Sequence, residues 1–258
     1  MSVIRDLAKS CIVLLLGHET RPRTIIRGLA SGYRICVSPD ENLGCLVGTA
    51  EPHLQRAIKE FVAAGDTVYD IGAHIGYVSL SLAKRVGPKG RVVAFEPLPR
   101  NADLLRKSIE ANGLKNIRLL EVAVSDRRGE TVIRMTENPA MASMVWHKND
   151  SSATETVVET VAIDDLIEAG DLSHPRFVKI DVEGGEGSVL LGMRGTLKDS
   201  RPILFLECSD TGRETAWEVL RGLGYRCQSA ITRKCVNDFE EYRHSDFLRL
   251  PSGELRRG

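Results

Sequence analysis

From about residue 66 onward, the chain alternates short runs of β-branched residues with segments of helical periodicity. The runs with strand character are 67–71, 91–96, 117–124, 177–182 and 203–207. Strands that alternate with helices form mostly parallel sheets with helices on both faces. The pattern therefore predicts an α/β domain built on a doubly wound sheet.

The segments between these runs are predicted to be helices. Residues 101–112 carry Leu104, Leu105 and Ile109 on one stripe and end at Gly113, which suits a helix C-terminus. Further helices are expected directly after Gly76, from Gly187 through Leu197, and over 211–221.

Two regions depart from the alternation. Residues 128–135 and 156–163 have strand character and flank a polar loop, 138–152. Its large apolar residues suit either a lid that shapes a pocket or loose packing against the domain. The C-terminal segments 225–236 and 246–250 are rich in strand formers. We expect them to close the sheet with an antiparallel pair.

The chain is divided by this pattern into a small N-terminal appendage, 1–64, and a main domain, 65–258. The appendage is expected to contain a first helix, a hairpin around 28–32 and a helix over 52–64.

Composition excludes several classes of protein. The 35 Lys and Arg residues balance 35 Asp and Glu residues, so no field of one sign favours nucleic acid as a partner. The longest apolar run, 11–16, is far shorter than the roughly 18–20 residues that cross a bilayer, so no membrane span is expected. The six cysteines lack zinc spacing, and no secretory signal is recognisable. We expect buried free thiols in a cytoplasmic protein.

The first strand of the main domain ends in an acid and a glycine turn. Asp70, Gly72 and Gly76 give the spacing DxGxxxG, not the GxGxxG of dinucleotide-binding loops. Glycine permits a tight turn and close backbone approach, whereas a carboxylate here repels a pyrophosphate. Asp70, Gly72, His74 and Gly76 are therefore predicted to contact a ligand that carries a positive group.

The next strand ends in Glu96, an acid in the place where nucleotide-binding units hold a ribose diol. On the third strand, Ala123 and Val124 could flank an adenine, while Ser125 or Asp126 meets its amino group. A ribose near the second strand and a cationic group near the first describe S-adenosylmethionine.

These motifs, together with the sequence VKIDVEG at 178–184, resemble the FkbM-like family of class I methyltransferases over about 66–250. The resemblance implies a seven-stranded Rossmann-like sheet, S-adenosylmethionine as cofactor, and O-methylation, commonly of sugar or natural-product hydroxyls. His74 stands where this family usually has Asn.

Lys179, Asp181 and Glu183 alternate along the fourth strand and are candidate catalytic residues. Lys179 and Asp181 share a face, and Asp181 lies near the carboxyl end, where open α/β sheets bind ligands. Asp181 is predicted to hold either the methionine ammonium or the acceptor hydroxyl, and Glu183 competes for that role. The alternative is a structural ion pair between Lys179 and one carboxylate.

A hydroxyl acceptor must lose its proton. The candidate bases are Asp181, Glu183, His74 and His147, the last in the 138–152 loop. A divalent cation held by Asp181, Glu207 and Asp210 is an alternative that we do not favour.

The sequence thus predicts an O-methyltransferase that acts on a small-molecule, glycan or natural-product acceptor. The acidic strand ends favour a neutral or cationic acceptor. The rival hypotheses are an N-methyltransferase, although the Asn-Pro-Pro-aromatic turn of that class is missing after the fourth strand, and a non-catalytic cofactor-binding module.

Overall fold

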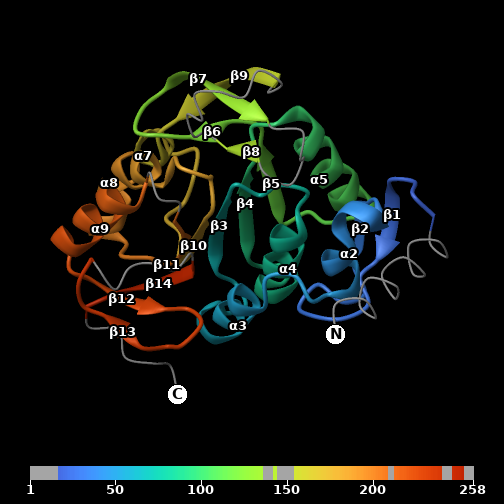
Figure 1. The fold of residues 1–258 in the computed structure, drawn as a ribbon, viewed down its shortest axis with the longest axis horizontal. Helices are drawn as coiled ribbons and strands as arrows, with labels where there is room; N and C mark the ends of the chain where they lie inside the picture. Colours follow the sequence, from blue (N-terminus) through green and yellow to red (C-terminus); the bar gives the residue numbers. More distant parts are fainter. Residues whose placement is uncertain (1–16, 136–141, 144–153, 209–211, 240–245, 253–258) are drawn as a thin grey trace.

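The computed structural model describes residues 17–135, 142–143, 154–208, 212–239 and 246–252, and its centre is a sheet of eight strands (Figure 1). In chain order these strands are β3 (Thr67–Ile71), β4 (Arg91–Phe95), β5 (Ile117–Leu120), β10 (Phe177–Ile180), β11 (Ile203–Glu207), β12 (Tyr225–Ser229), β13 (Cys235–Val236) and β14 (Asp246–Pro251).

The strand order across the sheet is β5-β4-β3-β10-β11-β14-β12-β13. Strands β5 to β11 pair in parallel, and β14 is antiparallel to both of its neighbours. The predicted Rossmann-like sheet with an antiparallel C-terminal strand is confirmed. It has eight strands where seven were expected, because Cys235 and Val236 pair with β12 at the edge.

The direction of strand addition reverses next to β3. Strands β4 and β5 extend the sheet on one side of β3, and β10 and β11 extend it on the other. In open α/β sheets such a switch point leaves a crevice at the carboxyl ends of the strands. The fold therefore places the ends of β3, β4, β10 and β11 around one site.

Helices cover both faces of the sheet. They are α2 (Pro39–Val47), α3 (Pro52–Phe61), α4 (Tyr77–Val86), α5 (Pro99–Ala111), α6 (Ile163–Glu168), α7 (Glu186–Leu191), α8 (Arg194–Asp199) and α9 (Arg213–Gly222). Helices α3 and α4 pack on one face and α6 to α9 on the other (Figure 1). No helix among the described residues combines the length and apolar character needed to span a bilayer.

The single helix expected from Gly187 to Leu197 is two short helices, α7 and α8. Asp164 of α6 explains the break, because its carboxylate accepts hydrogen bonds from the backbone N–H of Gly195 at 2.7 Å and of Thr196 at 2.8 Å. These bonds satisfy donors that open the new helix α8.

The two apolar layers follow from the alternation of side chains along each strand. In β10, Phe177 packs with α3 and α4, whereas Val178 packs with α6 to α9. By the same alternation, Lys179 faces the side of α3 and α4, and so does Asp70, its register partner on β3. Two charged side chains are thus enclosed between the sheet and a helix layer.

A second, smaller sheet of four strands lies beside the main sheet (Figure 1). Its strands are β6 (Ala123–Val124), β7 (Gly129–Met135), β8 (Ala142–Ser143) and β9 (Thr154–Val161). The strand expected over 117–124 is therefore divided: β5 ends at Leu120, and β6 pairs with β9 instead. The segment expected as strand through Ile163 ends at Val161, since α6 begins at Ile163.

The N-terminal segment forms the expected hairpin, β1 (Arg21–Thr24) and β2 (Arg34–Val37), ahead of α2 and α3. It packs directly on the main domain: Ile25 and Leu54 share an apolar cluster with Leu80 of α4. The Cys36 N–H donates to Ser108 Oγ of α5 at 2.8 Å. The N-terminal helix expected before the hairpin lies outside the described residues.

No disulfide joins the cysteines in the described part of the chain. Cys36, Cys208 and Cys227 are buried as expected, Cys45 is half-buried, and Cys235 on the edge strand β13 is exposed.

The turn after β3 brings two strand ends into contact. Gly72 has φ 79°, and a Cβ built there would lie 1.8 Å from the Asp181 carbonyl oxygen. The glycine is thus required by the approach of the β10 end, in addition to its left-handed backbone. Gly76 has a similar role toward α5, because its Cβ would lie 2.3 Å from Leu105 Cδ1.

Gly72→Ala is expected to lower the free energy of unfolding by about 2–4 kcal/mol, through left-handed strain plus a backbone clash. Gly170→Ala is the matched control, because Gly170 has φ 77° and open space around its Cβ position. It should cost only about 1–2 kcal/mol. Urea unfolding followed by circular dichroism measures both, and equal losses would contradict the role given to the Asp181 carbonyl.

Candidate functional site

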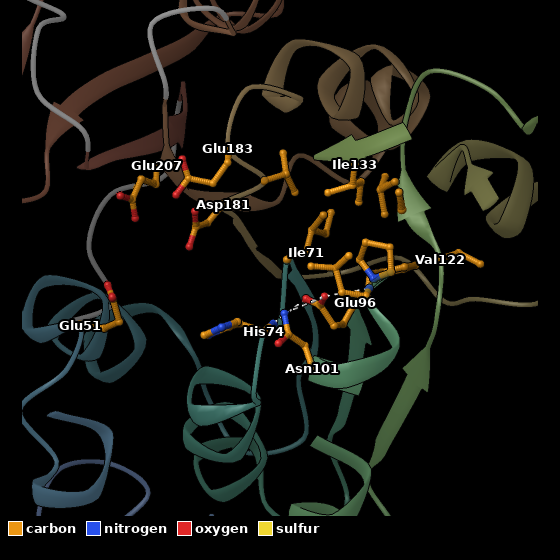
Figure 2. A pocket seen from close by; sticks show the side chains of 17 residues that line it. Glu51, Ile71, His74, Glu96, Asn101, Val122, Ile133, Asp181, Glu183 and Glu207 are labelled. Atoms are coloured by element: carbon orange, nitrogen blue, oxygen red, sulfur yellow. Dashed lines mark hydrogen bonds between the residues drawn. The ribbon is translucent and has the colours of Figure 1, made fainter. Parts of the chain in front are cut away.

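A cavity of about 300 Å³ opens at the carboxyl edge of the main sheet, at the switch point (Figure 2). Its walls come from the ends of β3, β4, β10 and β11, from the small sheet and from the N-terminal segment. The lining residues are Glu51, Ile71, Gly72, His74, Phe95, Glu96, Pro97, Leu98, Asn101, Val122, Ala123, Val124, Ile133, Asp181, Val182, Glu183 and Glu207.

Glu96 is fixed at the middle of the cavity wall. Its carboxylate accepts hydrogen bonds from the His74 N–H at 2.8 Å, the Leu98 N–H at 3.0 Å and Asn101 Nδ2 at 3.3 Å. The side chain is almost fully buried, and this burial raises the pKa of its carboxyl group, against the effect of the hydrogen bonds. Since a carboxylate has about four acceptor positions, Glu96 still has capacity for a ligand hydroxyl.

His74 lines the cavity and has φ 51°. Asn and His adopt this left-handed conformation more readily than most residues, which accounts for His at a position where Asn is usual. Burial and the nearby charge of Lys179 lower the pKa of the His74 ring, so the neutral imidazole is favoured.

Lys179 lies between two carboxylates beneath the cavity. Its ammonium is 3.6 Å from Asp70 Oδ1 and 3.3 Å from Asp181 Oδ2, and it donates to the Gly72 carbonyl oxygen at 2.6 Å. Burial lowers the pKa of Lys179, but the charges of Asp181 and Asp70 outweigh it and leave the ammonium protonated. This geometry is the ion pair that the sequence left as an alternative, here with two acidic partners.

Asp70 has no access to the cavity. Its side chain is fully buried, and Ser79 Oγ of α4 donates to it at 2.5 Å. Asp70 and Lys179 do not line the cavity, and neither does Gly76. The locations of Asp70, Gly76 and Lys179 give no support to their predicted roles in ligand contact or catalysis. Gly72, His74 and Asp181, by contrast, line the cavity wall.

One end of the cavity is apolar. Ala123 and Val124, the two residues proposed to flank an adenine, line it together with Val122, Leu98 and Ile133. Ile133 belongs to β7, so the small sheet covers this end of the crevice.

The remaining residues predicted for an adenine are placed elsewhere. Ser125 donates its backbone N–H to the Val161 carbonyl oxygen at 2.8 Å, and Asp126 is exposed beside Arg127. Neither lines the cavity.

The other end of the cavity is acidic. Glu51, Asp181, Glu183 and Glu207 come from separate segments, and Figure 2 shows them grouped on the side opposite Ile133 and Val122. Burial raises the pKa of Glu207 to about 8, and the charges of Asp181 and Asp246 add to that shift. Such a group favours a cationic ligand, because a positive charge there relieves the repulsion.

Glu51 was missed by sequence reasoning, and Glu207 was considered only as a metal ligand. Glu207 ends β11, beside the strand that carries Asp181, so its strand-end position was a usable signal. Glu51 precedes a helix in the N-terminal segment, where the sequence offers only a loose family resemblance around residues 48–52. His147 and Asp210 lie outside the described residues, and no metal-binding cluster is found among those that the structure describes.

A Rossmann-like sheet with antiparallel strands at its C-terminal edge and a cavity at its switch point is the fold of the class I methyltransferases. The chain belongs to the FkbM methyltransferase family, whose methyltransferase FkbM domain matches residues 70–239.

Curated relatives are similar over part of their length. The hexuronic acid methyltransferase AglP of Haloferax volcanii is 32% identical over 149 residues, or 57% of this chain and 58% of AglP. The 2-O-methyltransferase NoeI of Sinorhizobium fredii is 31% identical over 180 residues, covering 63% of this chain and 71% of NoeI. The solved FkbM methyltransferase of Methylobacillus flagellatus is 21% identical, with a TM-score of 0.46 over 72% of this chain and 43% of that one.

Lys179→Met is expected to lower the free energy of unfolding by about 3–5 kcal/mol, because it leaves the Asp70 carboxylate buried beside no cation. The double variant with Asp70→Asn should recover a substantial part of this loss, since the buried charge is then removed as well. Denaturant unfolding of the two single variants and the double variant measures the coupling, and simple additivity would contradict the ion-pair role.

Glu207→Gln is expected to become more stabilising as pH rises. The pKa of the Glu207 carboxyl group is raised from about 4.5 to about 8 in the folded protein. Between these pH values the folded protein holds a proton that the unfolded chain releases, so the free energy of unfolding of wild type falls as pH rises. Allowing for solvent screening, the difference in melting temperature between variant and wild type should grow by about 2–4 °C from pH 5 to pH 9. Exposed Glu168 is the control for the same substitution, and a difference independent of pH would contradict the raised pKa.

Proposed function

We propose that this chain transfers the methyl group of S-adenosylmethionine to a hydroxyl of a sugar or a sugar-containing small molecule. The observation that carries the proposal is the cavity at the switch point, which joins the buried Glu96 carboxylate to an apolar end and a carboxylate-rich end. Membership in the FkbM methyltransferase family supports the same reaction class.

The cavity residues suit the three parts of this cofactor. Glu96 has one acceptor position left for a ribose hydroxyl, and the apolar end around Leu98, Val122 and Ile133 suits an adenine. The acidic end beyond Asp181 suits the cationic part of the molecule. These residues suit the apolar adenine, the ribose hydroxyls and the cationic sulfonium and ammonium groups of S-adenosylmethionine.

S-adenosylmethionine supplies a methyl group on a sulfonium, which is already activated for displacement. The protein must then orient the acceptor, and orientation alone can supply on the order of 7–11 kcal/mol. The hydroxyl proton needs an acceptor at the cavity wall. Asp181, Glu183 and the neutral His74 ring line that wall and are the candidates for this role.

The acceptor class is inferred from the site and from the relatives together. The names of AglP and NoeI describe methylation of a hexuronic acid and 2-O-methylation. In this chain the wall near Asp181 carries Glu51, Glu183 and Glu207 as well. An acceptor without a carboxylate next to the reacting hydroxyl is therefore favoured.

Glu96→Gln is expected to weaken the binding of S-adenosylhomocysteine about 10- to 100-fold, because a charged acceptor for the ribose hydroxyls is lost. Isothermal titration calorimetry measures the affinity, and circular dichroism checks the fold. Glu121→Gln, at the exposed end of the neighbouring β5, is the matched control and should bind normally.

The function itself is tested by incubating wild type with S-adenosylmethionine and a set of methyl glycosides, with mass spectrometry of the products. A mass gain of one methyl group on a hydroxyl supports the proposal. If wild type fails to bind S-adenosylhomocysteine at all, the proposed function is wrong.

A further inference from the structure

Glu51 lines the cavity although it lies outside residues 70–239, the part of the chain matched by the family. It directly precedes α3 and has φ 52°, an unfavourable conformation for a residue with a Cβ. Strain of this kind persists only where surrounding contacts hold the backbone in place.

One buried side chain holds this turn together with backbone hydrogen bonds, among them those from the Thr49 and Ala50 N–H groups to the Gly44 carbonyl oxygen at 2.9 and 3.1 Å. Gln55 Nε2 is 2.7 Å from the Ala50 carbonyl oxygen and 3.2 Å from that of Gly48, both of which accept from it. The same nitrogen lies 3.0 Å from the Tyr77 hydroxyl, and Gln55 Oε1 accepts from the Leu29 N–H at 3.0 Å. Gln55 therefore ties the 48–51 turn to the hairpin and to α4.

Tyr77 links the hydrogen bonds of Gln55 to the cavity. It is the first residue of α4, immediately after Gly76, so it closes the glycine turn that begins at Gly72. The turn that carries Glu51 and the turn that carries His74 are thus fixed relative to each other. Figure 2 shows Glu51 facing the cavity across from Asp181 and Glu207, away from Ile133 and Val122.

The position of Glu51 assigns it to one side of the proposed reaction. If Glu96 holds the ribose and the apolar end holds the adenine, the far end contains the transferred methyl group and the acceptor. This step rests on the proposed function. Glu51 then lies on the acceptor side, where its negative charge acts on whatever group approaches the methyl.

We infer that Glu51 is a specificity-determining residue, held in place by Gln55, that selects an acceptor bearing an ammonium group or no charge over one bearing a carboxylate. The acceptor class that matches is an amino sugar or a neutral sugar. Gln55 is a positioning residue in this scheme, since it does not line the cavity.

Sinefungin provides a probe that needs no knowledge of the acceptor. In this cofactor analogue a carbon bearing an ammonium group replaces the sulfonium and its methyl, whereas S-adenosylhomocysteine has a neutral sulfur there. The ratio of the two dissociation constants therefore reports the electrostatic potential that the protein creates at the position of the transferred methyl group. Calorimetry at pH 7.5 gives both constants.

Wild type is expected to bind sinefungin more tightly than S-adenosylhomocysteine, and Glu51→Gln should reduce this preference about three- to tenfold. Gln55→Leu should reduce it in the same direction by releasing the turn. Glu110→Gln, a matched change at an exposed position on α5, should leave the preference unchanged.

An unchanged preference in Glu51→Gln, with normal affinity for S-adenosylhomocysteine, would overturn the role of Glu51. If Gln55→Leu keeps the full preference while it still binds S-adenosylhomocysteine, the positioning role of Gln55 is wrong. Loss of both ligands in wild type would instead reject the proposed function, so the two failures are distinguishable.

Discussion

The buried ammonium of Lys179 organises the carboxyl edge of the sheet. It joins Asp70 on β3 to Asp181 at the end of β10, and it binds the Gly72 carbonyl oxygen between them. Strands β3 and β10 lie side by side at the switch point, although no single helix connects one directly to the other along the chain. A single cation thus fixes the two strand ends whose separation defines the cavity, and every wall of the site is placed relative to that pair.

The chemistry of the cavity follows from where each segment ends. Parallel strands bring Glu96, Asp181 and Glu207 to one edge because all of them leave the sheet in the same direction. The small sheet then covers one end with Ile133, and the N-terminal turn closes the other with Glu51. The small sheet thus completes the apolar end of the cavity, and the N-terminal turn completes its acidic end.

Strand and helix periodicity was enough to predict the fold class, the antiparallel C-terminus and the edge at which the site lies. Glu96 and Asp181 were recognisable because they follow parallel strands, whose carboxyl ends form the ligand-binding edge of such sheets. The register that pairs Lys179 with Asp70 was not, since cross-strand neighbours depend on tertiary packing rather than on local pattern. For the same reason Glu51, brought to the cavity by Gln55 over a long sequence separation from the strand ends, left no local signal.

The walls of the cavity come from two parts of the chain, and a glycine makes the close backbone approach in each. On the strand ends, Gly72 touches the Asp181 carbonyl, so a change at one position disturbs the other. In the 48–51 turn, a Cβ on Gly48 would lie 1.9 Å from the Arg27 carbonyl oxygen. A substitution at Gly48 would therefore displace Glu51 without changing any residue that lines the cavity.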